Sequence, residues 1–281
     1  MINSICVIGA GTMGSGIAQV AAQSGFTTLL FDINEEVLSN AKAGIQKSLQ
    51  SLIEKQKISA EESDAVLQRL QFVNVINDCI ADVFIEAIIE KAEAKVDIFN
   101  KLAAINSSTS IFASNTSSLS ISDIQQSIIH PSRVVGMHFF NPAPIMKLVE
   151  VVKGKQTDDN TAQIIYNLCK QMSKVPVMCK DAPGFIVNRV ARHYYLEAMK
   201  MVEEGICTFE NIDAIMEASG FKMGPFKLMD LIGMDINLAV SKSIYEAFDK
   251  EERFAPSPLQ IDKVEKKELG RKTGKGFYHY N

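Results

Sequence analysis

A glycine run near the amino terminus, Gly9-Ala-Gly-Thr-Met-Gly14, constrains the fold of this chain more than any other feature. It follows Ile5 to Ile8, an apolar run with the length of a buried strand. Thr12 to Ser24 then has the pattern of a helix ended by Gly25. A G-x-G-x-x-G run between a strand and a helix is typical of a turn that binds the phosphates of a dinucleotide. The sequence therefore predicts such a turn at the start of an α/β domain.

Each position of this turn has a physical reason. Gly9 permits the tight strand-to-helix turn, a side chain at Gly11 would block the pyrophosphate, and Gly14 lets the helix pack closely on the strand. Thr12 and Met13 open the helix, whose free N–H groups and positive dipole end attract the pyrophosphate. We therefore assign these five positions to cofactor binding.

An acidic residue ends the next predicted strand. Asp32 follows Thr27 to Phe31, where a carboxylate accepts hydrogen bonds from ribose hydroxyls and repels a 2′-phosphate. The cofactor that this pattern favours is NAD rather than NADP. The alternatives are a flavin site or a turn without a ligand.

The first two thirds of the chain alternates strand and helix patterns, and the last third is helical. This predicts an α/β fold: a Rossmann-type domain with a mainly parallel sheet over residues 1–184, then an all-α domain over 185–281. Helices start at Asn34 and at a capping box formed by Ser59 and Glu62. Further strands are predicted at 72–76, 83–85, 111–113, 134–140, 148–152 and 175–179, and further helices at 93–105, 185–204, 209–219, 236–248 and 258–269.

Composition excludes several classes of protein. The formal net charge of −4 argues against a nucleic-acid partner. No stretch approaches the roughly 20 apolar residues of a membrane span. The five cysteines form no Cys-x-x-Cys pair and no zinc spacing, so we expect no metal and small buried thiols in a reducing compartment. A soluble, cytoplasmic protein is the expectation.

A histidine and a glutamate stand inside two neighbouring apolar strands. His138 lies in 134–140 and Glu150 in 148–152, and the turn Asn141-Pro-Ala-Pro144 joins them. Both side chains are costly to bury unless they pair. A carboxylate on one ring nitrogen fixes the tautomer and makes the other nitrogen a good base. The alternative is a hydrogen-bonded structural histidine.

Two further segments carry polar groups toward the expected site. Ser114-Asn-Thr-Ser-Ser118 follows a strand whose carboxyl end should face the cofactor, although it could equally cap the helix near Ser120. Asn188 and Arg189 open the first helix of the second domain after Pro183-Gly184. The alternative for this segment is a hinge followed by a solvated Asn-Arg pair.

These motifs together resemble the 3-hydroxyacyl-CoA dehydrogenase family, in its 3-hydroxybutyryl-CoA dehydrogenase branch. They span nearly the whole chain in order. The matching motifs are GAGTMG at 9–14, SNTSS at 114–118, MHFFNP at 137–142, KLVEV at 147–151, PGFIVNR at 183–189, MGP at 223–225 and GRKTGKGFY at 270–278.

The resemblance implies that an (S)-3-hydroxyacyl-CoA and NAD⁺ react reversibly to give a 3-ketoacyl-CoA and NADH. His138 would be the general acid and base, supported by Glu150. Ser117 and Asn188 would hold the substrate oxygens and complete the catalytic set. The free-acid β-hydroxyacid dehydrogenases are an alternative on the same plan, and a catalytically silent, crystallin-like structural protein is another.

The resemblance also implies contacts to the cofactor and to coenzyme A. Glu90, Lys95 and Asn115 match positions near the cofactor, although the first two alone read as a surface ion pair. Ser48 and Lys55 match positions that contact coenzyme A, and the alternative for them is a solvated helix face.

Two features of the second domain bear on substrate and assembly. Val190-Ala-Arg-His-Tyr-Tyr195 is more polar and aromatic than in many short-chain members, which leaves the acyl chain open. The apolar segment 228–239 resembles a dimerisation surface, so a homodimer or higher homo-oligomer is expected.

Overall fold

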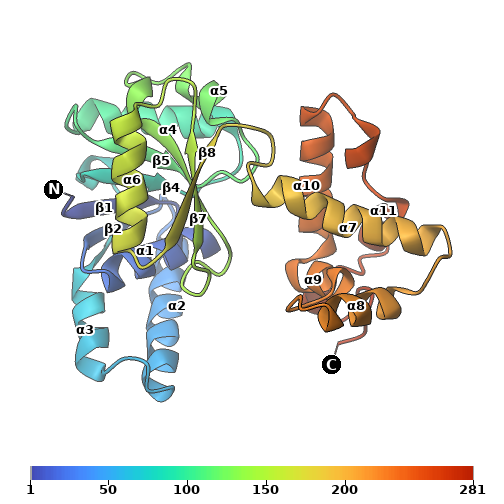
Figure 1. Ribbon diagram of the computed structural model, residues 1–281. Helices are drawn as coiled ribbons and strands as arrows, with labels where there is room; N and C mark the ends of the chain where they lie inside the picture. Colours follow the sequence, from blue (N-terminus) through green and yellow to red (C-terminus); the bar gives the residue numbers. More distant parts are fainter. Residues whose placement is uncertain (1, 281) are drawn as a thin grey trace. The chain divides into compact units, whose positions relative to one another are not determined.

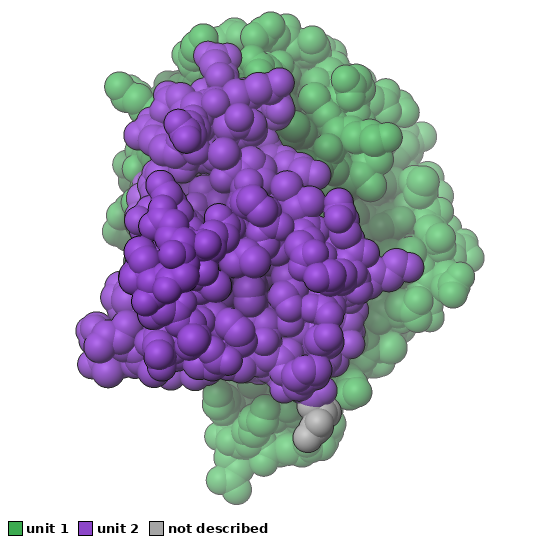
Figure 2. Space-filling view, turned by 90° about the vertical axis from the view of Figure 1, so that its right-hand side faces the viewer, with its two compact units in different colours: residues 1–182 green, residues 183–281 purple. Residues whose placement is uncertain are grey.

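The computed structural model describes residues 2–280, which divide after residue 182 into two compact units, unit 1 and unit 2 (Figure 2). Each unit has a hydrophobic core of its own. Within residues 2–280, no helix is long and apolar enough to cross a membrane. Over the same residues, no group of three or more His, Cys, Asp or Glu side chains is placed to hold a metal ion.

Unit 1 is built on one eight-stranded sheet in the order β3-β2-β1-β4-β5-β6-β7-β8 (Figure 1). Neighbouring strands pair in parallel except β6 and β7, which are antiparallel. The strand order reverses between β1 and β4, and dinucleotides bind across the carboxyl ends of strands at such a point. The strands are β1 (Ser4–Ile8), β2 (Thr27–Phe31), β3 (Leu70–Val73), β4 (Val83–Glu86), β5 (Ile111–Ser114), β6 (Val134–Phe139), β7 (Leu148–Lys153) and β8 (Val175–Lys180).

Helices cover both faces of this sheet (Figure 1). Because alternate strand residues point to opposite faces, each strand contributes to two cores. Val7 and Val151 belong to the core shared with α1, α2 and α6. On the other face, Phe84 stacks on Phe112 at 5.4 Å between ring centroids, and Phe99 of α4 packs against Phe112. The helices are α1 (Thr12–Gln23), α2 (Glu35–Glu54), α3 (Ala60–Arg69), α4 (Ala92–Ile105), α5 (Ile121–Gln125) and α6 (Asp159–Gln171).

The predicted helix starts and the fold class are confirmed. Asn34 caps α2 by accepting hydrogen bonds from two backbone N–H groups of its first turn. Ser59 and Glu62 form the capping box of α3. The helix expected near Ser120 is α5, but its cap is Ser120 itself and not a residue of the segment 114–118. The chain is an α/β protein with a mainly parallel sheet followed by an all-helical unit.

Some predicted elements are wrong in position, and two helices were not predicted. The strand expected at 72–76 is β3, Leu70–Val73, because its pairing with β2 begins at Leu70 opposite Thr28. Ile76–Asp78 forms a 3-10 turn, η1. No helix is predicted at α6 or at the eight-residue α9 (Pro225–Ile232).

Unit 2 consists of helices around an aromatic and methionine core. Its C-terminal segment is held by two buried carboxylates. Asp230 accepts hydrogen bonds from the N–H groups of Phe277 and Tyr278 at 3.0 and 2.9 Å, and Asp213 accepts one from the Tyr278 hydroxyl at 2.8 Å. The last helix ends earlier than predicted, since Lys267 has a φ of +58°. Besides α9, the helices are α7 (Val187–Glu203), α8 (Phe209–Ala218), α10 (Met234–Ala247) and α11 (Pro258–Glu265).

Candidate active site

The turn between β1 and α1 has no room for side chains at two of its glycines. Gly9 has a φ of +96°, and a Cβ there would lie 2.8 Å from the carbonyl oxygen of Ala87. A Cβ on Gly14 would lie 1.7 Å from the carbonyl oxygen of Gly9. At Gly11, in contrast, nothing lies within 4 Å of the Cβ position. The steric roles predicted for Gly9 and Gly14 are confirmed, and the backbone at Gly11 is open to a ligand.

The first turn of α1 can bind an anion. The first N–H groups of a helix have no partner within it. Gly11 is the N-cap residue and supplies no side-chain cap. Thr12 is exposed and Met13 is half-buried at this helix start. The donors and the positive end of the helix dipole therefore meet at the predicted phosphate position.

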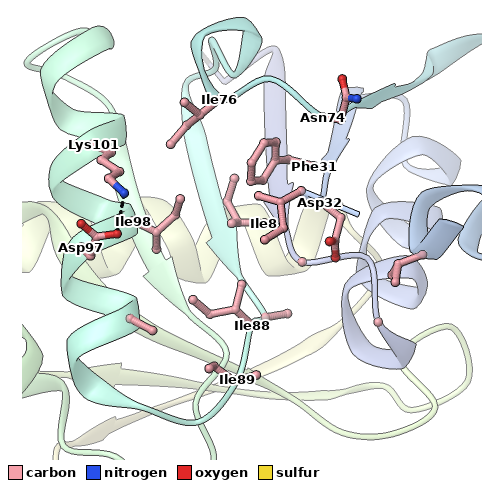
Figure 3. A pocket seen from close by; sticks show the side chains of 16 residues that line it. Ile8, Phe31, Asp32, Asn74, Ile76, Ile88, Ile89, Asp97, Ile98 and Lys101 are labelled. Atoms are coloured by element: carbon pink, nitrogen blue, oxygen red, sulfur yellow. Dashed lines mark ion pairs between the residues drawn. The ribbon is translucent and has the colours of Figure 1, made fainter. Parts of the chain in front are cut away.

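Asp32 lies just beyond β2, where hydrogen bonds from two backbone N–H groups orient its carboxylate. Its Oδ2 accepts a hydrogen bond from the N–H of Ala10 at 2.9 Å, and its Oδ1 accepts one from the N–H of Asn34 at 3.0 Å. The side chain lines a cavity of about 760 Å³, shown in Figure 3. Ile33, also on the wall, is 83% exposed.

Apolar side chains form most of this cavity. Ile8 and Phe31 come from the carboxyl ends of β1 and β2, and Ile88 follows β4 (Figure 3). Asp97 and Lys101 of α4 form an ion pair at 2.8 Å on the far wall. An apolar slot beside a carboxylate suits a nucleoside, with the base in the slot and the ribose at the carboxylate. Sequence patterns did not single out this slot.

A buried cluster of charges lies at the carboxyl end of β4. The Nζ of Lys95 is 2.6 Å from Oε1 of Glu86 and 3.1 Å from Oε2 of Glu90. Glu86 and Lys95 are almost fully buried, at 0% and 1% exposure, whereas 37% of the Glu90 side chain is exposed. The reading of Glu90 and Lys95 as surface residues is therefore wrong for Lys95, whereas Glu90 is exposed.

Glu90 also holds the loop that follows β5. Its Oε1 accepts hydrogen bonds from the hydroxyl of Thr116 at 2.5 Å and from the N–H groups of Ser117 and Ser118 at 3.0 and 3.2 Å. Burial raises the pKa of Glu90, but the Lys95 ammonium and these hydrogen bonds outweigh it, so the net pKa lies below the ordinary value. The loop is thus fixed to an ionised carboxylate.

Sequence reasoning missed Glu86, the fully buried carboxylate of this cluster. Its carboxylate accepts hydrogen bonds from the N–H of Ile88 at 2.8 Å and from the hydroxyl of Ser114 at 2.7 Å, besides the Lys95 contact. A signal was present, because a glutamate ends the apolar run 83–85. A charge at that place needs a partner, as His138 does.

The predicted pairing of His138 with Glu150 is confirmed. The two residues are directly opposite each other in the antiparallel ladder of β6 and β7, so their side chains share one face of the sheet. The Nδ1 of His138 lies 2.7 Å from Oε2 of Glu150. Both are buried, at 6% and 1% exposure. The carboxylate therefore sets which ring nitrogen carries the proton.

The loop after β5 is tied to the histidine strand. The side chain of Asn115 accepts a hydrogen bond through Oδ1 from the N–H of Phe139 at 2.8 Å. Since Phe139 adjoins His138, the structure brings Asn115 and Ser117 together with the histidine at the carboxyl ends of β5 and β6. Ser117 is half-buried there.

The remaining three predicted residues lie on helices α2 and α7. Asn188 is in the first turn of α7, in unit 2. Ser48 is half-buried on α2, and Lys55 is the exposed C-cap residue of the same helix. Neither Ser48 nor Lys55 lines the cavity beside Asp32.

Comparisons with known proteins show the family of this chain. A model of the 3-hydroxyacyl-CoA dehydrogenase NAD-binding domain matches residues 4–182, and a model of the C-terminal domain of the same family matches residues 184–280. The chain belongs to the 3-hydroxyacyl-CoA dehydrogenase family. It is therefore an oxidoreductase of that family with a NAD-binding domain.

Relatives cover the whole chain. It is 45% identical to 3-hydroxyadipyl-CoA dehydrogenase of Escherichia coli over 99% of its length, but spans only 59% of that protein. It is 40% identical to the mitochondrial hydroxyacyl-coenzyme A dehydrogenase of Mus musculus, covering all of this chain and 92% of the relative. The crystal structure of (S)-3-hydroxybutyryl-CoA dehydrogenase from Ralstonia eutropha superposes with a TM-score of 0.95 at 37% identity, with full coverage of both chains.

Proposed function

We propose that this protein oxidises a short-chain (S)-3-hydroxyacyl-CoA, such as 3-hydroxybutyryl-CoA, reversibly to the 3-ketoacyl-CoA with NAD. The observation that carries the proposal is the buried pair of His138 and Glu150 near the carboxyl end of β6, in a chain with a NAD-binding domain. An imidazole held by a carboxylate is the group that this reaction needs as its general base.

The proposed proton path uses the two nitrogens of His138 differently. Glu150 accepts a hydrogen bond from the Nδ1–H of His138, so that Nε2 is the nitrogen that takes the proton from the 3-hydroxyl. Bound NAD⁺ supplies the acceptor for the hydride from C3. As His138 gains its positive charge, Glu150 stabilises it. In the reverse direction, His138 returns the proton to the 3-keto oxygen.

Ser117 and Asn188 are the proposed ligands of the substrate oxygens, and they fix the direction in which C3 faces the acceptor. Support for Ser117 comes from its fixed loop: the Ser117 N–H is held by Glu90, and the neighbouring Asn115 is tied to β6. Support for Asn188 comes from its place in the motif that opens α7.

The proposed cofactor contacts follow the strand ends. The glycine turn with Thr12 and Met13 would bind the pyrophosphate, and Asp32 the adenosine ribose. Glu90, Lys95 and Asn115 would then border the nicotinamide half. For coenzyme A we propose Ser48 and Lys55 on α2 as contacts to the polyanionic end.

The acyl group is the least constrained part of the substrate. The E. coli relative is named for a dicarboxylic substrate, 3-hydroxyadipyl-CoA, and the Ralstonia relative for 3-hydroxybutyryl-CoA. A kinetic series of 3-ketoacyl-CoAs from four carbons upward, with 3-ketoadipyl-CoA beside it, tests this part of the proposal. A kcat/KM that is highest for acetoacetyl-CoA supports a short chain, and a higher value for 3-ketoadipyl-CoA overturns it.

The reaction class has its own test. NADH should be oxidised with acetoacetyl-CoA but not with free acetoacetate. Turnover of the free acid would instead indicate a β-hydroxyacid dehydrogenase. No turnover of either compound by a protein that binds NADH would indicate a silent structural protein.

We also propose that the protein is a homodimer or higher homo-oligomer. Leu231, Ile232 and Ile236 in the apolar segment 228–239 are 49%, 37% and 50% exposed. Sedimentation equilibrium should give at least twice the 31.0 kDa chain mass, and Ile236→Lys should shift the population toward monomer. A monomer at all concentrations contradicts this proposal.

A further inference from the structure

We propose that the net negative charge of the cluster of Glu86, Lys95 and Glu90 shifts the relative affinity of the cofactor site toward the oxidised nicotinamide, which carries a positive charge, and away from the neutral reduced ring. This inference rests on the proposed function, because it requires NAD to lie across the strand ends. It assigns a role to Glu86, and to the charge of the cluster as a whole.

The cluster contains two carboxylates but only one ammonium group. Lys95 is shared between two carboxylates at 2.6 and 3.1 Å. Among residues 2–280, neither Glu86 nor Glu90 has an ion pair with a second cation. The side chain of Glu86 only accepts hydrogen bonds, from Ile88, Lys95 and Ser114, as a carboxylate does. The pKa of Glu90 is lowered by the ammonium and by its hydrogen bonds, despite burial. The formal charges of the three side chains therefore sum to −1.

The position of the cluster relative to the cofactor follows from the topology. Asp32 and the apolar slot lie at the β2 side of the glycine turn, and suit the adenosine half. A dinucleotide extends across the point where the strand order reverses, so its other half lies toward β4 and β5. Glu86 ends β4, and Glu90 holds the loop that follows β5.

Burial strengthens the effect of this net charge on a bound cofactor. Lys95 and Glu86 are shielded from water, so salt and solvent screen them much less than surface charges. Removing one unit charge roughly 10 Å from a cation, at an effective dielectric constant of about 20, changes an affinity by about tenfold. The neutral ring of NADH does not experience this change. The quantity that reports the cluster is therefore the ratio of the dissociation constants of NAD⁺ and NADH.

A charge series separates electrostatics from packing. Glu86→Gln retains shape and most hydrogen bonds but makes the cluster neutral, and the NAD⁺/NADH ratio of Kd should rise by about tenfold. Glu86→Gln with Lys95→Gln restores the net charge of −1 and should return the ratio toward the wild-type value. Glu90→Gln also makes the cluster neutral, and it does so at a partly exposed residue. This variant decides the test if Glu86→Gln does not fold. The matched control is Glu93→Gln, since Glu93 is an exposed residue of α4, the helix that carries Lys95.

Isothermal titration calorimetry with each cofactor gives the ratios without turnover. A raised ratio in the neutral clusters, with recovery in the double variant and no change in Glu93→Gln, supports the inference. An unchanged ratio in Glu86→Gln and Glu90→Gln, or no recovery in the double variant, overturns it while leaving the proposed function intact. A wild-type protein that binds neither cofactor overturns both.

Discussion

His138 of β6 faces Glu150 of β7 directly across the antiparallel ladder, with 2.7 Å between Nδ1 and Oε2. The close approach of these strands depends on a glycine two residues upstream. A Cβ at Gly136 would lie 2.6 Å from Cβ of Val152, its partner in the ladder. Because both polar side chains are buried, removal of either one takes away a hydrogen bond that the other makes in a low-dielectric setting.

Glu150→Gln should lower kcat by about 100-fold, since the amide still accepts the Nδ1 proton but no longer stabilises the positively charged imidazole. NADH binding should not change. Stopped-flow or steady-state kinetics with acetoacetyl-CoA give kcat, and fluorescence titration gives the Kd of NADH. Glu246→Gln, an exposed change, serves as the control. Wild-type kcat in the Glu150 variant would remove this carboxylate from the mechanism.

Asp32→Ala combined with Ile33→Arg should relax the cofactor preference toward NADPH. The double change removes the carboxylate that repels a 2′-phosphate and adds a cation at an 83% exposed position on the same wall. The measurement is kcat/KM for NADH and for NADPH. If their ratio stays at the wild-type value, Asp32 is not the ribose ligand.

Gly14→Ala and Gly11→Ala should separate folding from cofactor binding. The Cβ at residue 14 would overlap the carbonyl oxygen of Gly9, which should cost about 3 kcal/mol of unfolding free energy. At Gly11 there is open space, and its φ of −67° suits alanine, so the unfolding free energy of Gly11→Ala should be unchanged. The new methyl group would block the approach of the pyrophosphate, so NADH should bind about tenfold more weakly. Urea unfolding and NADH titration measure the two effects. Equal stability losses in both variants would contradict this division.

Two cysteines should be inert in the native protein. Burial raises the pKa of Cys169 to about 12. Burial, with the charges of Glu150 and Asp181, raises the pKa of Cys179 to about 11. At pH 8, only about one Cys179 thiol in 1,000 is ionised, and the thiolate is the reactive form. Iodoacetamide labelling with peptide mapping should detect these two only after unfolding. Rapid native labelling of either would show that its thiol is ionised.

The parts of the site that rest on local rules were predictable from the sequence. The glycine turn follows from backbone sterics, and the pairing of His138 with Glu150 follows from the cost of burying each alone. The pairing also required that the two strands be neighbours, which the short connection between them indicated.

The rest depends on contacts between residues far apart in the sequence. Glu86 was missed because its partner Ser114 lies 28 residues away on another strand. Lys95 appeared to be a surface residue, whereas in the folded protein it is buried and contacts Glu86 at the end of β4. Helix α6 was missed because its buried face includes Thr161 and Cys169 among few aliphatic residues. The start of β3 was set by pairing with β2, which a single strand pattern does not reveal.

Replacement of His138 tests the central claim most directly. In His138→Gln, kcat for acetoacetyl-CoA reduction should fall by about 1,000-fold or more, the size of the effect of a positioned general acid. The Kd of NADH, measured by fluorescence on the same preparation, should stay at the wild-type value. Wild-type turnover by this variant would contradict the role of His138, whereas loss of both turnover and NADH binding would point to a structural role for the buried pair.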